Sequence, residues 1–160
     1  MKKILCKISF VMTFVVMSLL FVSCNDDYPD DGYFKVNETS YTVNEALLKS
    51  VGLEGDYHQL RLTLNNTNTN DAHSLNFLLY SEVDEYLPSA TYTPYLYDDN
   101  YHNKFKRGVW ELNGVEAGAI LLGSVKVTKS NDIYTIHINC KDVNNNDISG
   151  YYKGEIKVIK

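Results

Sequence analysis

The chain has 160 residues, of which 44% are hydrophobic and 22% charged, an ordinary composition for one globular domain. Three of its 15 basic residues precede Cys24 and all 20 acidic residues follow it, so the part from Cys24 onward has 12 basic side chains and a net charge near −8. This balance argues against nucleic-acid binding, which needs clustered Lys and Arg, and against adsorption to anionic lipid.

Residues 1–23 are typical of a secretory signal peptide. A start rich in lysine precedes the apolar run Ile8–Val22, which is shorter than the roughly 20 residues of a membrane-spanning helix. The ending Phe21-Val22-Ser23-Cys24 resembles a bacterial lipobox, in which a small residue precedes a cysteine that is acylated, for example with palmitate. Phe21 stands where leucine is usual. We expect cleavage before Cys24 and lipidation of its thiol; a permanent anchor helix is the alternative.

The segment 24–32 contains Asp26, Asp27, Asp30 and Asp31 and is interrupted by a proline, so we expect a solvated tether. It also resembles the acidic export signal that follows the lipidated cysteine in surface lipoproteins of the Bacteroidetes group. This predicts a protein anchored by lipid in the outer membrane and facing the cell exterior. The alternative is a plain linker on a periplasmic lipoprotein.

Short strand patterns alternate with polar turns after the tether. Tyr33–Val36 and Tyr41–Asn44 are expected to form a hairpin, and the alternating leucines between 60 and 64 predict a strand with one buried face. Ser74–Tyr80 is a further strand. Asn44–Val51 is the one plausible helix, because its apolar residues fit a single helical turn.

The C-terminal part predicts three antiparallel strands joined by turns at Lys129–Asp132 and Asp142–Asp147. The side chains expected inside are Tyr134, Ile136, Ile138, Cys140, Tyr152, Gly154, Ile156 and Val158. We therefore predict a single all-β domain over residues 33–160, an antiparallel β-sandwich of about eight strands, with a small up-and-down β-barrel as the alternative.

Three segments, Leu75–Tyr80, Leu87–Thr93 and Gly123–Ile156, together resemble small Bacteroidetes lipoproteins of uncharacterised function. In those proteins a strand reading roughly G-x-V-x-V-x-K-S precedes Y-x-I and a closing G-x-Y-x-G. The matching residues are Gly123, Val125, Val127, Lys129, Ser130, Tyr134, Ile136, Gly150, Tyr152 and Gly154. Ala90 stands where such chains often have glycine. The resemblance implies an all-β surface domain and supplies no functional residues.

No catalytic signature occurs in the sequence: G-x-S-x-G, H-E-x-x-H, the P-loop and C-x-x-C are all missing. Asp142-x-Asn144-x-Asn146 copies the start of a calcium loop, but Lys153 stands where the closing glutamate is needed, so a plain turn is favoured. Cys140 has no partner for a disulfide and is expected to be a small buried side chain. We expect a protein that is not an enzyme and has no cofactor or bound metal.

Aromatic residues are concentrated in the segment from Tyr92 to Trp110, which is expected to be a loop. Sugars bind to flat aromatic faces beside planar hydrogen-bonding groups, because their C–H faces are apolar and their hydroxyls need partners. Tyr95, Tyr97, Tyr101 and Trp110 are therefore the candidate ligand-binding residues. The alternative is that these side chains cover a small β core with their polar tips in water.

Three functions fit these features. The first is a surface-displayed binding or interaction module with a glycan or another protein as partner, and it requires exposed aromatic residues around a groove. The second is a structural or assembly component of an envelope complex or fimbria, which requires an open strand edge. The third is a small barrel that carries an apolar ligand in an internal cavity.

Overall fold

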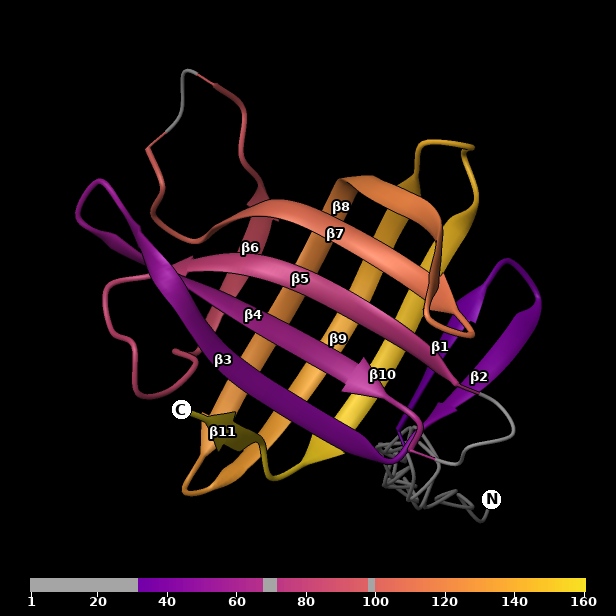
Figure 1. Cartoon of the computed structure of the whole chain (residues 1–160), viewed down its shortest axis with the longest axis horizontal. Helices are drawn as coiled ribbons and strands as arrows, with labels where there is room; N and C mark the ends of the chain where they lie inside the picture. The colour runs from indigo at the N-terminus through magenta and orange to yellow at the C-terminus, as the bar shows by residue number, and fades with distance from the viewer. Residues whose placement is uncertain (1–31, 68–71, 98–99) are drawn as a thin grey trace, which may run out of the picture.

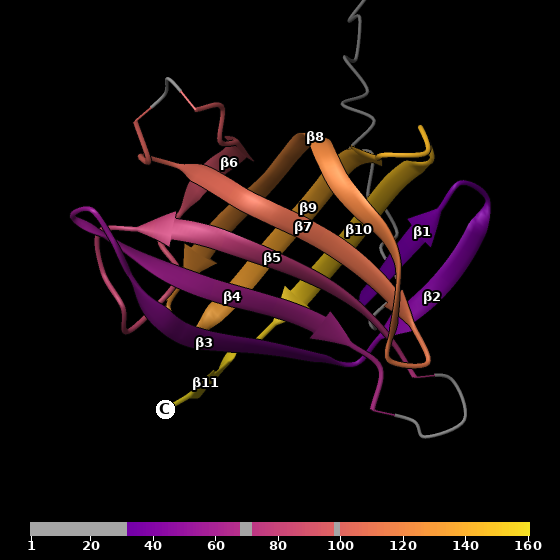
Figure 2. The same ribbon diagram turned by 45° about the horizontal axis from the view of Figure 1, so that its top comes forward.

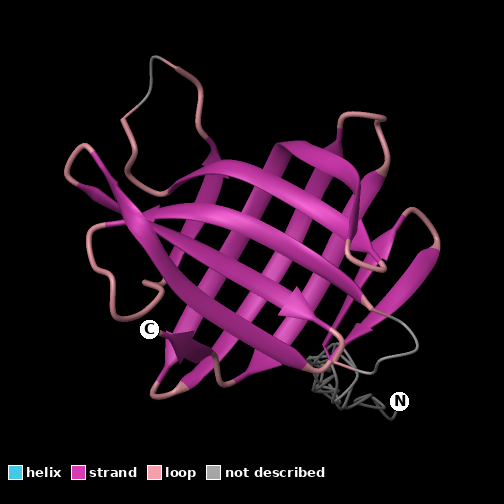
Figure 3. Ribbon diagram, in the orientation of Figure 1, coloured by secondary structure: helices cyan, strands magenta, loops and turns pink. Residues whose placement is uncertain are grey.

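The computed structural model describes residues 32–67, 72–97 and 100–160, and within these ranges the chain consists of strands and loops without a helix (Figure 3). The signal peptide, Cys24 and the tether up to residue 31 lie outside the described residues. In the described part of the chain, no helix is long and apolar enough to cross a bilayer. The strands are β1 (Gly32–Val36), β2 (Thr39–Val43), β3 (Glu45–Glu54), β4 (Tyr57–Asn65), β5 (His73–Ser81), β6 (Ala90–Pro94), β7 (Lys104–Leu112), β8 (Val115–Ser130), β9 (Ile133–Asp142), β10 (Asp147–Gly154) and β11 (Lys157–Ile159).

All of these strands belong to one sheet of 11 strands in the order β11-β3-β4-β5-β7-β6-β8-β9-β10-β1-β2. The sheet curls back on itself, so that β3, β4, β5 and β7 form a first layer that crosses a second layer of β8, β9, β10 and β1 (Figures 1 and 2). The predicted all-β class is confirmed. The two layers face each other as in a sandwich, while their continuity in one curled sheet is a feature of barrels.

Strand β8 connects the two layers. Its first part pairs with β7 and its second part with β9, and a register shift between Ile120 and Leu122 marks the change. Gly123 follows this shift with a φ of +111°, and a Cβ atom there would overlap the backbone of Asn139 and Cys140. Glycine is therefore required, because no other residue combines this backbone angle with so close an approach between strands.

The core lies between the layers and is formed by alternate residues of each strand. Tyr134, Ile136, Ile138 and Cys140 are buried on β9, whereas Asn139 is exposed, which confirms the predicted inner face of this strand. The hairpin of β1 and β2 is also confirmed, and its two-residue turn begins at Asn37 with a φ of 54°. The largest fully buried side chains are Tyr80, Tyr92, Phe34, Phe77, Phe105, Leu48, Leu60, Leu62, Leu64, Leu75, Leu79 and Leu87.

The helix expected over Asn44–Val51 is wrong, because this segment belongs to β3. Ala46 and Leu48 are buried, and they pair with Leu64 and Leu62 of β4. Two buried side chains separated by one residue satisfy a strand as well as they satisfy one helical turn, so the neighbouring strand decided the outcome.

The last predicted strand is also different in the structure. Strand β10 ends at Gly154, and the chain then crosses to the opposite layer, where β11 pairs in parallel with β3. Val158, expected inside, is 45% exposed, and Ile156 is only partly buried against the core. The change of layer interrupts the alternation that placed these side chains inward.

Candidate functional site

Three connections meet at one end of the first layer: the β3–β4 turn, the segment 82–89 between β5 and β6, and the described parts, 95–97 and 100–103, of the connection between β6 and β7 (Figure 1). His102 Nδ1 lies 3.1 Å from Glu82 Oε1, and His58 Nδ1 lies 4.0 Å from Asp84 Oδ2. Leu87 is fully buried and anchors the second connection in the core. Loops held against a rigid sheet in this way are common places for binding sites.

Five tyrosines gather where the connections meet, and we call them the tyrosine cluster: Tyr57, Tyr80, Tyr95, Tyr97 and Tyr101. The rings of Tyr95 and Tyr101 stack with centroids 4.8 Å apart and 18° between their planes. Tyr101 also lies 4.5 Å from Tyr80 and 5.9 Å from Tyr57, and Tyr97 lies 6.1 Å from Tyr95. Each distance is within the range of favourable aromatic contacts.

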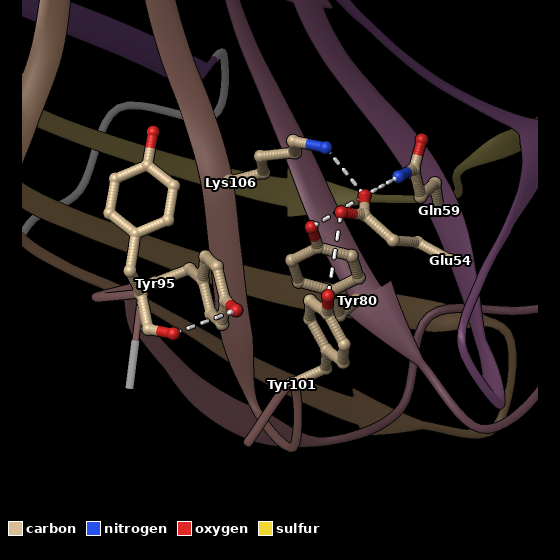
Figure 4. A network of polar contacts seen from close by, with 7 residues as sticks. Glu54, Gln59, Tyr80, Tyr95, Tyr101 and Lys106 are labelled. Atoms are coloured by element: carbon tan, nitrogen blue, oxygen red, sulfur yellow. Dashed lines mark hydrogen bonds and ion pairs between the residues drawn. The ribbon is translucent and has the colours of Figure 1, made fainter. Parts of the chain in front are cut away.

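The carboxylate of Glu54, at the end of β3, holds this cluster in place (Figure 4). Its Oε2 atom accepts hydrogen bonds from the Tyr80 hydroxyl at 2.8 Å and from Lys106 Nζ at 2.6 Å, and Gln59 Nε2 donates to the same atom. The Tyr101 hydroxyl donates to Oε1 at 3.5 Å. Two rings of the cluster, those of Tyr80 and Tyr101, are therefore held by Glu54 without a ligand, and preorganisation of this kind reduces the entropy lost on binding.

These contacts change the acid–base properties of the cluster. The hydrogen bonds from Lys106 and Tyr80 lower the pKa of Glu54 more than its partial burial raises it, so its carboxylate is ionised at neutral pH. Burial raises the pKa of Tyr80, and the nearby Glu54 carboxylate raises it further. The hydroxyl of Tyr95, together with burial and Glu54, raises the pKa of Tyr101 to about 12. At neutral pH the Glu54 carboxylate is therefore charged and the phenols of Tyr80 and Tyr101 are protonated, so that the hydrogen bonds between them are formed. This arrangement suits a binding surface.

The outer part of the cluster is open to solvent. Tyr97 is 98% exposed and its neighbour Leu96 is 61% exposed, whereas Tyr95 and Tyr101 are half-buried. Tyr95 donates a hydrogen bond to the carbonyl oxygen of Tyr97 at 3.5 Å, so the exposed residue is connected to the packed part. The structure thus brings together three of the candidate residues from the sequence.

Trp110, the fourth candidate, lies elsewhere. It belongs to β7, is only 8% exposed, and its Nε1 donates to Asp142 Oδ2 at 3.1 Å in the interior. The expected loop from Tyr92 to Trp110 is also shorter than predicted, because both of its ends are strands. Tyr92 and Phe105 are each 1% exposed. These three aromatic residues pack in the core and do not contribute to the exposed surface.

A surface groove of about 360 Å³ lies beside the cluster on the outer face of the first layer. Leu78 in the groove and Tyr80 in the cluster point to the same face of β5, since they are two residues apart in one strand. Hydrogen bonds run from Thr63 to Asn76 at 2.7 Å, from Asn76 to Ser74 at 2.9 Å and from Ser74 to Glu111 at 2.9 Å. The groove is lined by Arg61, Asn76, Phe77, Leu78, Arg107, Val109, Glu111 and Glu116.

Sequence reasoning missed Glu54, Arg61 and the groove. Glu54 lies far from the aromatic segment in the chain and reaches it only through the pairing of β3, β4 and β5. The alternation around Arg61 indicated that its side chain points outward. The pattern within one strand, however, does not tell which residues of the neighbouring strand lie beside it. Arg107 lies within the aromatic segment from Tyr92 to Trp110 and gave no signal of its own.

Asp142 has a structural role in the predicted turn. Its Oδ1 accepts the backbone N–H groups of Asn144 and Asn146, both at 2.9 Å, and its Oδ2 accepts from the Asn146 side chain as well as from Trp110. A search for three or more His, Cys, Asp or Glu side chains placed to hold a metal ion found no such group within the described ranges.

Comparison with models of protein families, with curated proteins and with solved structures found no match to this chain. The resemblance of the segment Gly123–Ile156 to Bacteroidetes lipoproteins therefore stays a prediction.

Proposed function

We propose that the domain is a binding module without catalytic activity, displayed on the bacterial outer membrane, which recognises a glycan through the tyrosine cluster. The observation that carries this proposal is the exposure of Tyr97, 98% open to solvent, on a packed set of rings of which Tyr80 and Tyr101 are hydrogen-bonded to the Glu54 carboxylate. Isolated exposed tyrosines are ordinary on protein surfaces. An exposed ring joined to a rigid cluster beside a groove is the arrangement expected of a ligand platform.

The chemistry of the cluster suits a sugar. The faces of Tyr95 and Tyr97 offer apolar surface for the C–H groups of a pyranose ring, while the phenolic hydroxyls offer hydrogen-bonding partners. Tyrosine provides a large contact area with few rotatable bonds, so little side-chain entropy is lost when a ligand is bound. Both properties support recognition of a sugar ring, whether the ring is uncharged or has a charged substituent.

Binding is tested with a pair of matched tyrosine variants. Tyr97→Ala removes the exposed platform, and the loss of one stacking contact of about 0.5–1.5 kcal/mol predicts glycan binding weaker by up to about tenfold. Tyr86→Ala is the control, because Tyr86 is 41% exposed but lies against Lys129, outside the cluster. Both variants should keep the melting temperature of the wild type. Equal glycan-array signals from all three proteins would contradict the proposal.

The envelope location depends on Cys24 and on the acidic tether. Fatty-acid labelling in cells should be lost in Cys24→Ala, and the variant should leave the membrane fraction. Protease added to intact cells should degrade the domain, and replacement of Asp26, Asp27, Asp30 and Asp31 by alanine should protect it. Labelling that persists in Cys24→Ala would exclude lipidation at this residue. Equal degradation with and without the four aspartates would mean that the tether is only a linker and not an export signal.

An assembly component is the second candidate, and the edges of the sheet favour it. Strand β11 lies at one edge, and its residues Val158 and Ile159 are 45% and 37% exposed. A strand from another chain can pair with such an edge through its backbone. The carrier function has less support, because large side chains such as Phe34 and Phe77 fill the space between the layers. Oligomerisation that is lost on deletion of β11 would favour assembly over glycan binding.

A further inference from the structure

The sequence contains only two arginines, Arg61 and Arg107, and the fold brings both into the groove beside the tyrosine cluster. They are far apart in the chain and lie on β4 and β7, the two strands that flank β5. The protein is acidic overall, so a pair of arginines in one groove stands out from the rest of the surface.

The strand register places the two arginines in one row. Arg61 is opposite Leu78, and Leu78 is opposite Arg107, so that an apolar side chain separates the two guanidinium groups. The two Cα atoms are about 10 Å apart, because adjacent strands are spaced by about 4.8 Å. Lys49 of β3 is opposite Arg61 and adds a third cation to the same row. Side chains of directly paired residues point to the same face of a sheet.

The acidic residues of the groove neutralise only part of this charge. Arg107 Nη2 lies 2.6 Å from Glu116 Oε2, and Glu111 accepts a hydrogen bond from Ser74. Among the described residues, neither Arg61 nor Lys49 has an ion-pair partner. A guanidinium has five N–H donors in a planar fork that matches a carboxylate in two parallel hydrogen bonds. Arg61 therefore has its full donor set available for an anion.

From these observations we infer that the groove binds the carboxylate of an acidic glycan, with Arg61 as the primary donor, while the tyrosine cluster contacts a neighbouring sugar of the same chain. The inference rests on the proposed function, since it names the class of glycan for the same site. Leu78 lies between the arginines and offers apolar contact to a sugar ring. Tyr80 follows two residues later on β5, so groove and cluster are close enough to be spanned by one oligosaccharide.

The experiment compares an oligogalacturonate with a neutral galactan oligomer of the same length, by calorimetry on the full-length lipoprotein in detergent. The wild type should bind the acidic oligomer more tightly, and added salt should reduce this preference. Arg61→Gln should weaken acidic binding about tenfold or more and leave neutral binding unchanged. Arg61→Lys should recover only part of the loss, because the ammonium has no fork. Lys126→Gln, which removes an exposed cation from the second layer, is the matched control.

The outcomes separate this inference from the function on which it rests. A wild type that binds the neutral oligomer equally well, or an Arg61→Gln variant that keeps its acidic preference, overturns the inference. If Tyr97→Ala still weakens binding of the neutral oligomer, the glycan module remains. An equal loss of acidic binding in Lys126→Gln would mean that the preference for the acidic oligomer comes from the overall charge of the protein and not from Arg61. If inorganic phosphate or an acidic peptide competes as effectively as galacturonate, the groove is an unspecific anion site and not a site for the carboxylate of a glycan.

Discussion

The pair of Trp110 and Asp142 gives a stability prediction that also decides what Trp110 does. In Asp142→Ala, the indole N–H of Trp110 is left in the core without its acceptor, at a cost of about 1–3 kcal/mol. The backbone N–H groups of Asn144 and Asn146 lose an acceptor too, each worth about 0.5–1.5 kcal/mol. Together these losses predict a decrease of about 2–6 kcal/mol in the free energy of unfolding, a large share of the roughly 5–15 kcal/mol of a typical domain.

Urea unfolding followed by far-ultraviolet dichroism measures this change, and the m-value should stay constant. Trp110→Phe should cost less in the Asp142→Ala background than in the wild type, because the lost hydrogen bond is counted only once. Strict additivity of the two substitutions, or a decrease below about 1 kcal/mol for Asp142→Ala, would refute the structural role.

The same carboxylate predicts a pH dependence. Burial raises the pKa of Asp142, but the hydrogen bonds from Asn146, Trp110 and Asn144 lower it more, so the net pKa is below the ordinary value. A pKa that is lower in the folded state stabilises the fold above the unfolded value of about 3.9. This stabilisation is lost as the pH falls through the lower folded value. The stability difference between wild type and Asp142→Asn should therefore shrink in acid below about pH 4.

Three other expectations concern single side chains. Gly123→Ala should cost about 3 kcal/mol or more, because it combines a φ of +111° with overlap of the next strand, whereas Gly114→Ala, at a φ of +75° with open space around it, should cost about 1 kcal/mol in the same urea assay. Burial raises the pKa of the Cys140 thiol to about 11, so iodoacetamide should label it only after unfolding, and labelling of the native protein would contradict its burial. Tyr101→Phe should remove a tyrosine that titrates near pH 12 in an ultraviolet titration; the stabilisation from this raised pKa is present below about pH 10 and is lost as the pH rises through 12.

The parts of the fold that local pattern determines were predictable from sequence. The alternation in β9 defined its buried face, and polar turns rich in asparagine defined the hairpins on both sides. Segment Asn44–Val51 was misread because its pattern fits a helical turn as well as a strand, and its pairing with β4 decided the outcome. Val158 was misread because its environment is set by β3, a strand distant in the chain that pairs with β11. Local pattern contains no information about such partners.

The candidate site likewise contains residues that the sequence indicated and residues that it could not indicate. Composition alone indicated Tyr95, Tyr97 and Tyr101, because aromatic residues were concentrated there. It also suggested Trp110, whose burial depends on an acceptor contributed by the β9–β10 turn. Glu54 and Arg61 were not predictable as site residues, since their positions beside the tyrosines follow from register across three strands.

The two longest-range pairings of the sheet, β1 with β10 and β11 with β3, have a consequence for how the chain folds. Both join an early strand of the domain to a late one: the pairing of β1 needs β10 up to Tyr151, and the pairing of β3 with β11 needs Lys157–Ile159. Folding that waits for contacts between distant parts of the sequence is slow, commonly on a scale of milliseconds to seconds for all-β domains. In a nascent chain of this protein, β1 therefore stays without its partner β10, and β3 without its partner β11, until each of these late strands has been made, so these two pairings complete the sheet last.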